Sequence, residues 1–198
     1  MKKLLKSKNN YISLGKINFQ GYSNSENWIG YYEAKNKSSI SKIHDATQLF
    51  LDYFKEDIKN FILVSALADN SHSMIISTDK EDAIYSSIFK LAKQKGFIQE
   101  YSSEFNDYLE QDLELPAKLL NINFECDFYM PFCELVMAYY FNKIAGQVCF
   151  LINSELQLAF YPHDDIGFGC ISLNSDISAG VEFLEYCKKN EEFHVVIS

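Results

Sequence analysis

The sequence predicts an α+β domain with a mainly antiparallel sheet and packed helices. Apolar runs and two-residue alternations, which are typical of strands, interleave irregularly with segments at helical spacing. The segments that predict hairpins are concentrated in the C-terminal half, whereas a doubly wound parallel sheet requires regular alternation of strands and helices. With 198 residues, 47% of them hydrophobic, the chain is long enough for a sizeable core. We therefore expect a single domain over residues 1–198, with a weak joint near 112–120.

The N-terminus is predicted to be a flexible basic leader over residues 1–10. The first sixteen residues hold five lysines and no acid. Apolar residues from Tyr11 onward then predict a first strand that ends near Gly21. The segment around Trp28 is compatible with either a short helix or a second strand.

Helical spacing begins at Ser39 and continues to Phe54, with apolar residues on one face and charged residues on the other. The apolar run Phe61–Ala68 predicts a buried strand, and Ser73–Ser77 is its expected hairpin partner. Thr78 and Glu81 then form a capping box, in which the hydroxyl and the carboxylate accept hydrogen bonds from the first free amides of a helix. Gly96 is the expected end of that helix.

Strict alternation of apolar and polar residues over 120–129 predicts a half-buried strand. The elements expected after it are a helix from Pro131 to Gly146, a hairpin of 148–152 and 156–161, a strand at 169–174, a helix within 175–190 and a strand at 193–197.

The charge pattern disfavours nucleic acid as a partner. All 18 basic residues are lysine, and the net charge is −9. Arginine is the side chain that grips phosphates and guanine edges in a bidentate manner, and a negative protein repels a phosphate backbone. An AT-rich genome accounts for most of the missing arginine, but the acidic excess needs its own explanation.

The cysteines indicate buried, reduced thiols. Their number is odd, none belongs to a CxxC pair, and most lie in apolar runs, so neither a disulfide framework nor a structural zinc site is expected. The N-terminus lacks the apolar stretch of a signal peptide, and no run approaches the roughly 20 apolar residues that cross a bilayer. We therefore expect a cytoplasmic protein without a membrane partner.

The strongest functional feature is an acidic stretch without lysine over residues 99–114, in which aromatic residues alternate with the acids. At helical spacing its aromatic residues and Leu109 would face one way and leave the carboxylates as a negative ridge. An ordinary solvated helix face is the simpler explanation, although such faces usually mix both signs of charge. The predicted partner-binding residues are Glu100, Tyr101, Glu104, Asp107, Tyr108, Glu110, Asp112 and Glu114.

A second candidate site is the segment 161–169, where His163, Asp164 and Asp165 adjoin. A histidine beside two carboxylates can bind a divalent metal or act as a general base. The simpler interpretation is a tight polar turn between two strands, where Pro, Asp and Gly are expected. Phosphate-loop, dinucleotide, zinc-protease, nucleophile-elbow and EF-hand patterns are all missing from the sequence. No catalytic residue, enzyme activity or cofactor is therefore predicted.

In size, acidity and aromatic-rich acidic surface, the chain resembles the immunity proteins of bacterial toxin–immunity systems, including contact-dependent inhibition. At motif level the resemblance covers residues 148–173, which include FYPHDDIGFGCI. It implies a protein that binds and blocks a toxin domain, often a basic nuclease, and that is not itself an enzyme. We therefore expect an acidic binding protein that neutralises a basic partner. The alternative is a metal-dependent hydrolase or small-ligand enzyme built on His163, Asp164 and Asp165.

Overall fold

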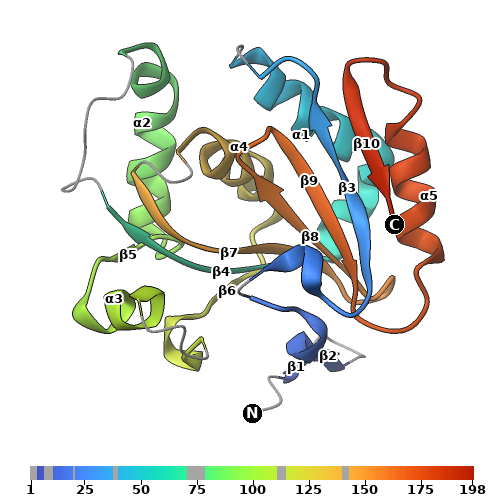
Figure 1. The fold of residues 1–198 in the computed structure, drawn as a ribbon. Helices are drawn as coiled ribbons and strands as arrows, with labels where there is room; N and C mark the ends of the chain where they lie inside the picture. Colours follow the sequence, from blue (N-terminus) through green and yellow to red (C-terminus); the bar gives the residue numbers. More distant parts are fainter. Residues whose placement is uncertain are drawn as a thin grey trace.

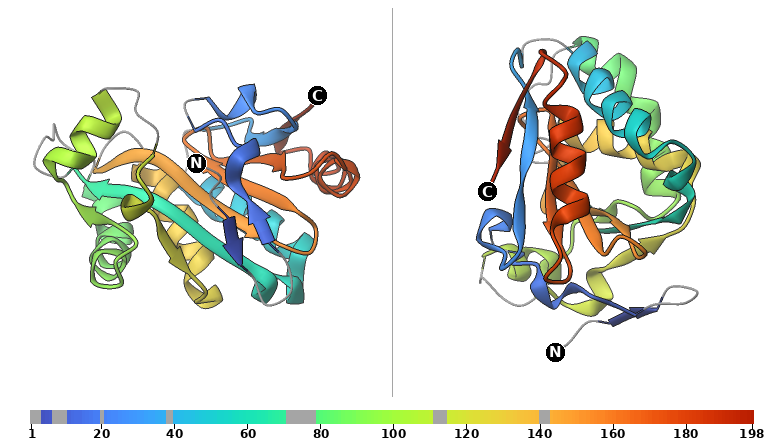
Figure 2. Two further views of the ribbon diagram at one scale, coloured as in Figure 1. Left: turned by 90° about the horizontal axis from the view of Figure 1, so that it is seen from below. Right: turned by 90° about the vertical axis from the view of Figure 1, so that its right-hand side faces the viewer.

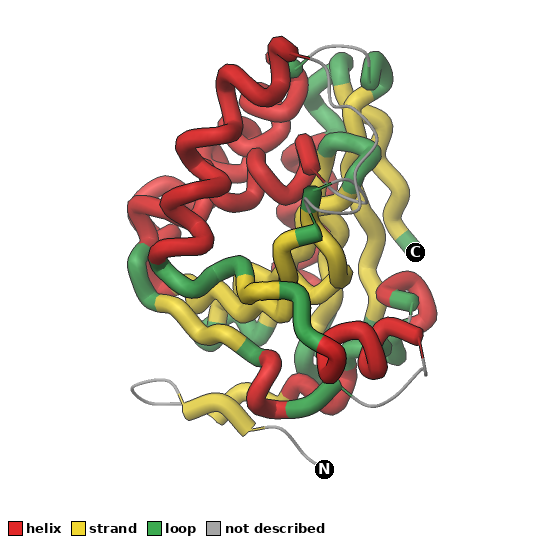
Figure 3. The backbone as a smooth tube through the Cα atoms, turned by 90° about the vertical axis from the view of Figure 1, so that its left-hand side faces the viewer, coloured by secondary structure: helices red, strands yellow, loops and turns green. Residues whose placement is uncertain are grey.

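A computed structural model of the chain shows one large sheet with most of the helices gathered on one side (Figures 1 and 3). The α+β class with a mainly antiparallel sheet is confirmed. The structure describes residues 4–6, 11–19, 21–37, 40–70, 79–110, 115–139 and 143–198.

Within the described residues the sheet has eight strands. Seven lie in the order β10-β3-β9-β8-β7-β4-β5, and the eighth, β6, pairs with β4. Every pairing is antiparallel except that of β4 with β5. A separate small hairpin joins β1 to β2. The strands are β1 (Leu4–Lys6), β2 (Tyr11–Ser13), β3 (Trp28–Ala34), β4 (Phe61–Asp69), β5 (Gln99–Glu100), β6 (Asn121–Asn123), β7 (Ile144–Asn153), β8 (Leu158–His163), β9 (Gly167–Ser172) and β10 (Phe193–Ile197).

Most of the helices form a layer on one face of the sheet, and α3 lies on the opposite face together with the N-terminal segment (Figure 2, left). The α-helices are α1 (Ser41–Phe54), α2 (Asp79–Gln94), α3 (Ser103–Glu110), α4 (Tyr129–Tyr139) and α5 (Ser178–Cys187). Short 3-10 helices are found at Leu14–Lys16, Tyr22–Asn24, Lys55–Asn60, Ala117–Leu119 and Cys126–Phe128.

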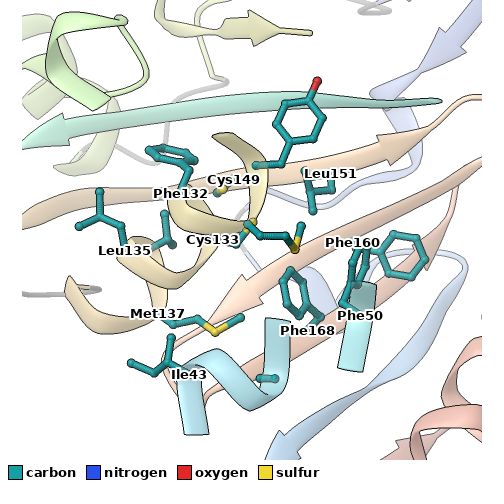
Figure 4. Close-up of a cluster of buried hydrophobic side chains, with 14 of the residues drawn as sticks. Ile43, Phe50, Phe132, Cys133, Leu135, Met137, Cys149, Leu151, Phe160 and Phe168 are labelled. Atoms are coloured by element: carbon teal, nitrogen blue, oxygen red, sulfur yellow. The ribbon is translucent and has the colours of Figure 1, made fainter. Parts of the chain in front are cut away.

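Both faces of the central strands are buried. Alternate residues of β4 point into two separate hydrophobic clusters, with Leu63 in the cluster under the helices and Val64 in the cluster on the other face. This explains why β4 is a continuous apolar run and not an alternating one. Figure 4 shows the larger cluster, where Phe50 of α1 stacks on Phe168 of β9 with ring centroids 4.8 Å apart.

Several predicted elements are confirmed: the helix from Ser39 is α1, the buried run is β4, and the C-terminal hairpin is β7–β8 followed by β9. The ambiguous segment at Trp28 is strand β3. The hairpin partner expected at Ser73–Ser77 and the capping residue Thr78 lie outside the described residues. Leu4–Lys6, inside the predicted flexible leader, forms a short strand, and the flexibility of that leader remains a prediction.

Three predicted elements are wrong in extent. The strand expected from Tyr11 to near Gly21 ends at Ser13, and a 3-10 helix follows at Leu14–Lys16. The helix expected from Pro131 to Gly146 ends at Tyr139, and Gly146 belongs to β7, where its φ of +93° accompanies a register shift opposite Ala66 and Ala68. The strand expected over 120–129 is reduced to three residues. Its alternation does not reflect burial, because Ile122 is 43% exposed and Phe124 is 68% exposed.

All five cysteines are free thiols, and all except Cys126 are buried. Burial raises the pKa of the Cys133 and Cys170 thiols well above the usual value, and that of Cys187 as well. The thiolate is the reactive form of cysteine. These thiols are therefore expected to react slowly, because they are buried and because their raised pKa keeps them protonated.

We expect one thiol, Cys126, to react quickly with an alkylating reagent at neutral pH, and the four buried thiols to react at least about 10-fold more slowly. Intact-mass spectrometry over time measures the number of adducts. In denaturant all five should react, and C126S should remove only the fast phase. Several fast phases in the native protein would contradict the buried positions.

Within the described part of the chain, no helix is both long and apolar enough to cross a membrane.

Candidate functional site

The described part of the acidic segment, residues 99–110, contains β5 and α3 at one end of the sheet, apart from α1, α4 and α5 (Figure 1). The helix begins only at Ser103. Ser102 precedes it, and its Oγ accepts a hydrogen bond from the Phe105 backbone N–H at 3.1 Å. The expectation that Tyr101 lies on one helical face with Tyr108 and Leu109 is therefore wrong, because Tyr101 precedes the helix.

One buried ring anchors α3 to the sheet. Phe105 is fully buried in the cluster on that face, and Tyr108 packs against it with ring centroids 6.0 Å apart. The Phe105 ring lies over Gly146 of β7, where an added Cβ would stand 2.9 Å from it. Burial also raises the pKa of Tyr108. The helix is thus fixed to the sheet by its inner side.

Lysines from other elements neutralise part of the predicted ridge. Lys93 of α2 pairs with Glu100 at 3.0 Å, and Lys118 pairs with Glu104. The sequence stretch 99–114 contains no lysine, but the fold brings two lysines to it.

The segment that contains α3 also holds two exposed acids and two partly exposed apolar side chains. Asp107 and Glu110 are exposed, and no lysine or histidine in the described residues forms an ion pair with either of them. Tyr101 is 40% exposed and Leu109 is 37% exposed. We call these four residues the α3 acidic surface. Asp112 and Glu114, which complete the predicted set, lie outside the described residues.

The second candidate site is the turn that joins β8 to β9, as the simpler interpretation of this segment predicts. The backbone N–H of Ile166 donates to the carbonyl of His163 at 3.1 Å and closes the turn. Ile166 has a φ of +60°, which for a β-branched residue costs about 1–2 kcal/mol. Its side chain is 6% exposed, and this burial holds the turn in place.

The turn brings the three predicted metal ligands together. One ligand atom from each of His163, Asp164 and Asp165 lies within 4.8 Å of the others. Both carboxylates are exposed, whereas the Nε2 atom of His163 is buried and has no hydrogen-bond partner among the described residues. Burial lowers the pKa of His163. Asp165, Asp164, Glu33 and a hydrogen bond of the imidazole with the Tyr32 backbone oppose that shift.

A lysine from the neighbouring strand end reaches the same turn. Lys37 Nζ contacts a carboxylate oxygen of Asp165, and it lies 3.0 Å from Glu33 Oε2. Both carboxylates raise the pKa of Lys37, with Asp165 the larger cause. The site therefore holds one protein cation among several acids.

Aromatic rings line the sheet beside this turn. The Tyr31 ring meets the imidazole of His163 edge-on, with centroids 5.8 Å apart. The Tyr161 ring crosses β9 at Gly169, where an added Cβ would stand 2.0 Å from the ring. Its hydroxyl accepts a hydrogen bond from Trp28 Nε1 at 3.0 Å. Burial raises the pKa of Tyr161 to about 12.

Comparison of the chain with protein-family models, with curated proteins and with solved structures finds no significant match.

Both candidate sites could be predicted from the sequence, but the lysines that pair with their acids could not. The pairs Lys93–Glu100 and Lys118–Glu104 lack the i,i+3 or i,i+4 spacing of a helical ion pair. Lys37 is 128 residues from Asp165. Only the sheet order, which places β3 beside β9, brings Lys37 and Asp165 together.

Proposed function

We propose that the chain is an acidic binding protein that neutralises a basic protein partner, and that this partner is a toxin domain of the nuclease kind that immunity proteins block. The observation that carries the proposal is the α3 acidic surface: its two acids form no ion pair within the described residues, and its two apolar side chains are partly exposed. Phe105 anchors the helix that carries three of these four residues. The net charge of −9 also attracts a basic partner.

Such a surface has the two components that a charge-steered interface uses. Carboxylates attract a cationic partner from beyond contact distance, and this steering is strongest when no internal cation neutralises them. Tyr101 and Leu109 supply exposed apolar area in the same segment of the chain, and aromatic residues are enriched among the residues that dominate binding free energy. Because α3 is fixed to the sheet, little conformational entropy is lost when a partner binds.

The first test is affinity capture with the partner unknown. The full chain is immobilised as wild type, as D107K/E110K, and as E182K/E185K, and retained proteins are identified by mass spectrometry. Glu182 and Glu185 are exposed acids at the same i,i+3 spacing on α5, so the control makes the same change in net charge at a different place.

We expect a basic protein to be retained by the wild type and by E182K/E185K, and to be lost from D107K/E110K. Equal retention by all three proteins would show that α3 is not the docking surface. Loss from both variants would mean that total charge, and not the α3 acidic surface, determines binding.

A further inference from the structure

We propose that the β8–β9 turn is a binding site for a divalent transition-metal ion such as Zn²⁺ or Mn²⁺, with His163, Asp164 and Asp165 as ligands. This inference is independent of the proposed partner-binding function, because it concerns a different part of the sheet.

Three donors converge without any rearrangement of the backbone. One ligand atom of each residue is already within 4.8 Å of the others. Donors bonded to zinc at about 2.0–2.2 Å in tetrahedral geometry lie roughly 3.3 Å apart. Asp164 and Asp165 are exposed and can close this difference by rotating about their side-chain bonds.

A second and independent observation is the Nε2 atom of His163. It is buried and has no hydrogen-bond partner among the described residues, and it is the one such side-chain atom found in them. A buried polar atom without a partner costs free energy, and a metal ion bound to Nε2 would remove that cost. Two carboxylates at the same turn favour a cation over a neutral ligand.

The donor set also selects the class of ion. An imidazole suits Zn²⁺ and related transition metals, whereas Mg²⁺ and Ca²⁺ prefer a shell of oxygen atoms alone. Three protein ligands leave at least one coordination position for water, which is the arrangement of an open and not a closed zinc site.

Lys37 occupies part of this site as an internal cation. Its ammonium contacts Asp165 and Glu33, so it neutralises the acids when no metal is bound. The Lys37 side chain is 45% exposed and can move out into solvent. Since a metal ion must displace the ammonium from Asp165, removal of Lys37 should strengthen metal binding.

The test is isothermal titration of the chelator-treated full chain with ZnCl₂. We expect one Zn²⁺ to bind the turn, with an affinity that falls at least about 10-fold in D164N and in H163Q. K37M should bind more tightly than the wild type. D164N changes an exposed side chain and is expected to fold normally, which thermal unfolding of each variant checks.

The matched control is E155Q. Glu155 is an exposed acid in the β7–β8 turn, at the other end of β8, and the substitution removes the same charge. Equal affinities of D164N and E155Q for Zn²⁺ would overturn the proposal. So would the lack of any Zn²⁺ binding by the wild type below about 1 mM, which corresponds to only about 4 kcal/mol of binding free energy.

Discussion

Replacement of Gly30 by alanine is expected to lower the free energy of unfolding by about 3 kcal/mol or more. Gly30 has a φ of +148°, which L side chains rarely adopt, and it lies at a register shift in the pairing of β3 with β9. An added Cβ would stand 2.0 Å from the carbonyl oxygen of Val196 on β10 and 3.0 Å from the Leu184 side chain. A backbone atom cannot give way as a side chain can, so β10 would have to separate from β3.

Urea unfolding followed by circular dichroism measures this loss. The control is G15A, because Gly15 has no positive φ and an added Cβ there would meet its nearest neighbour at an ordinary 3.4 Å. G15A should change the stability by no more than about 0.5 kcal/mol. A G30A variant as stable as G15A would show that β10 does not pack against β3 at this position.

Replacement of Lys93 by methionine is expected to cost about 2–3 kcal/mol of stability. Lys93 pairs with Asp69, whose side chain is 4% exposed at the end of β4, and also with Glu100 of β5. Without the ammonium, a buried carboxylate loses a cationic partner, and one of the contacts between α2 and the sheet is removed. Asp69 has further interactions, which keep the expected cost below that of a wholly uncompensated charge.

The comparison for this prediction is K188M. Lys188 pairs with Glu185 at 3.3 Å, but both side chains are more than half exposed. Exposed pairs contribute about 0–1 kcal/mol, so K188M should unfold at nearly the wild-type urea concentration. If K93M and K188M unfold at the same concentration, the pair with Asp69 does not stabilise the fold.

Local patterns were sufficient for elements whose burial follows their own periodicity. The α1 helix, the doubly buried β4 and the β7–β8–β9 hairpins could all be predicted in this way. The pattern failed where a neighbouring element determined burial. The alternation at 120–129 predicted an inner apolar face, but β6 lies at the edge of the sheet beside β4, where Ile122 and Phe124 stay exposed.

The two candidate sites also differ in how far local sequence determines them. His163, Asp164 and Asp165 adjoin in the sequence, so their cluster could be predicted from local residues alone. The charge of the acidic stretch could not, because its partners Lys93 and Lys118 arrive through tertiary packing. Within the described residues, Glu100 and Glu104 are each paired with a lysine, whereas no ion pair forms at Asp107 or Glu110.

Docking of a basic protein on the α3 acidic surface is tested by the association rate constant of the captured partner. Stopped-flow measurements compare wild type, D107K/E110K and E182K/E185K at low salt and at about 0.5 M salt, where surface charges are largely screened. We predict that D107K/E110K associates roughly 10-fold more slowly at low salt and loses most of its salt dependence, while E182K/E185K stays close to the wild type. Equal rate constants and equal salt dependence for D107K/E110K and the wild type would contradict docking on the α3 acidic surface.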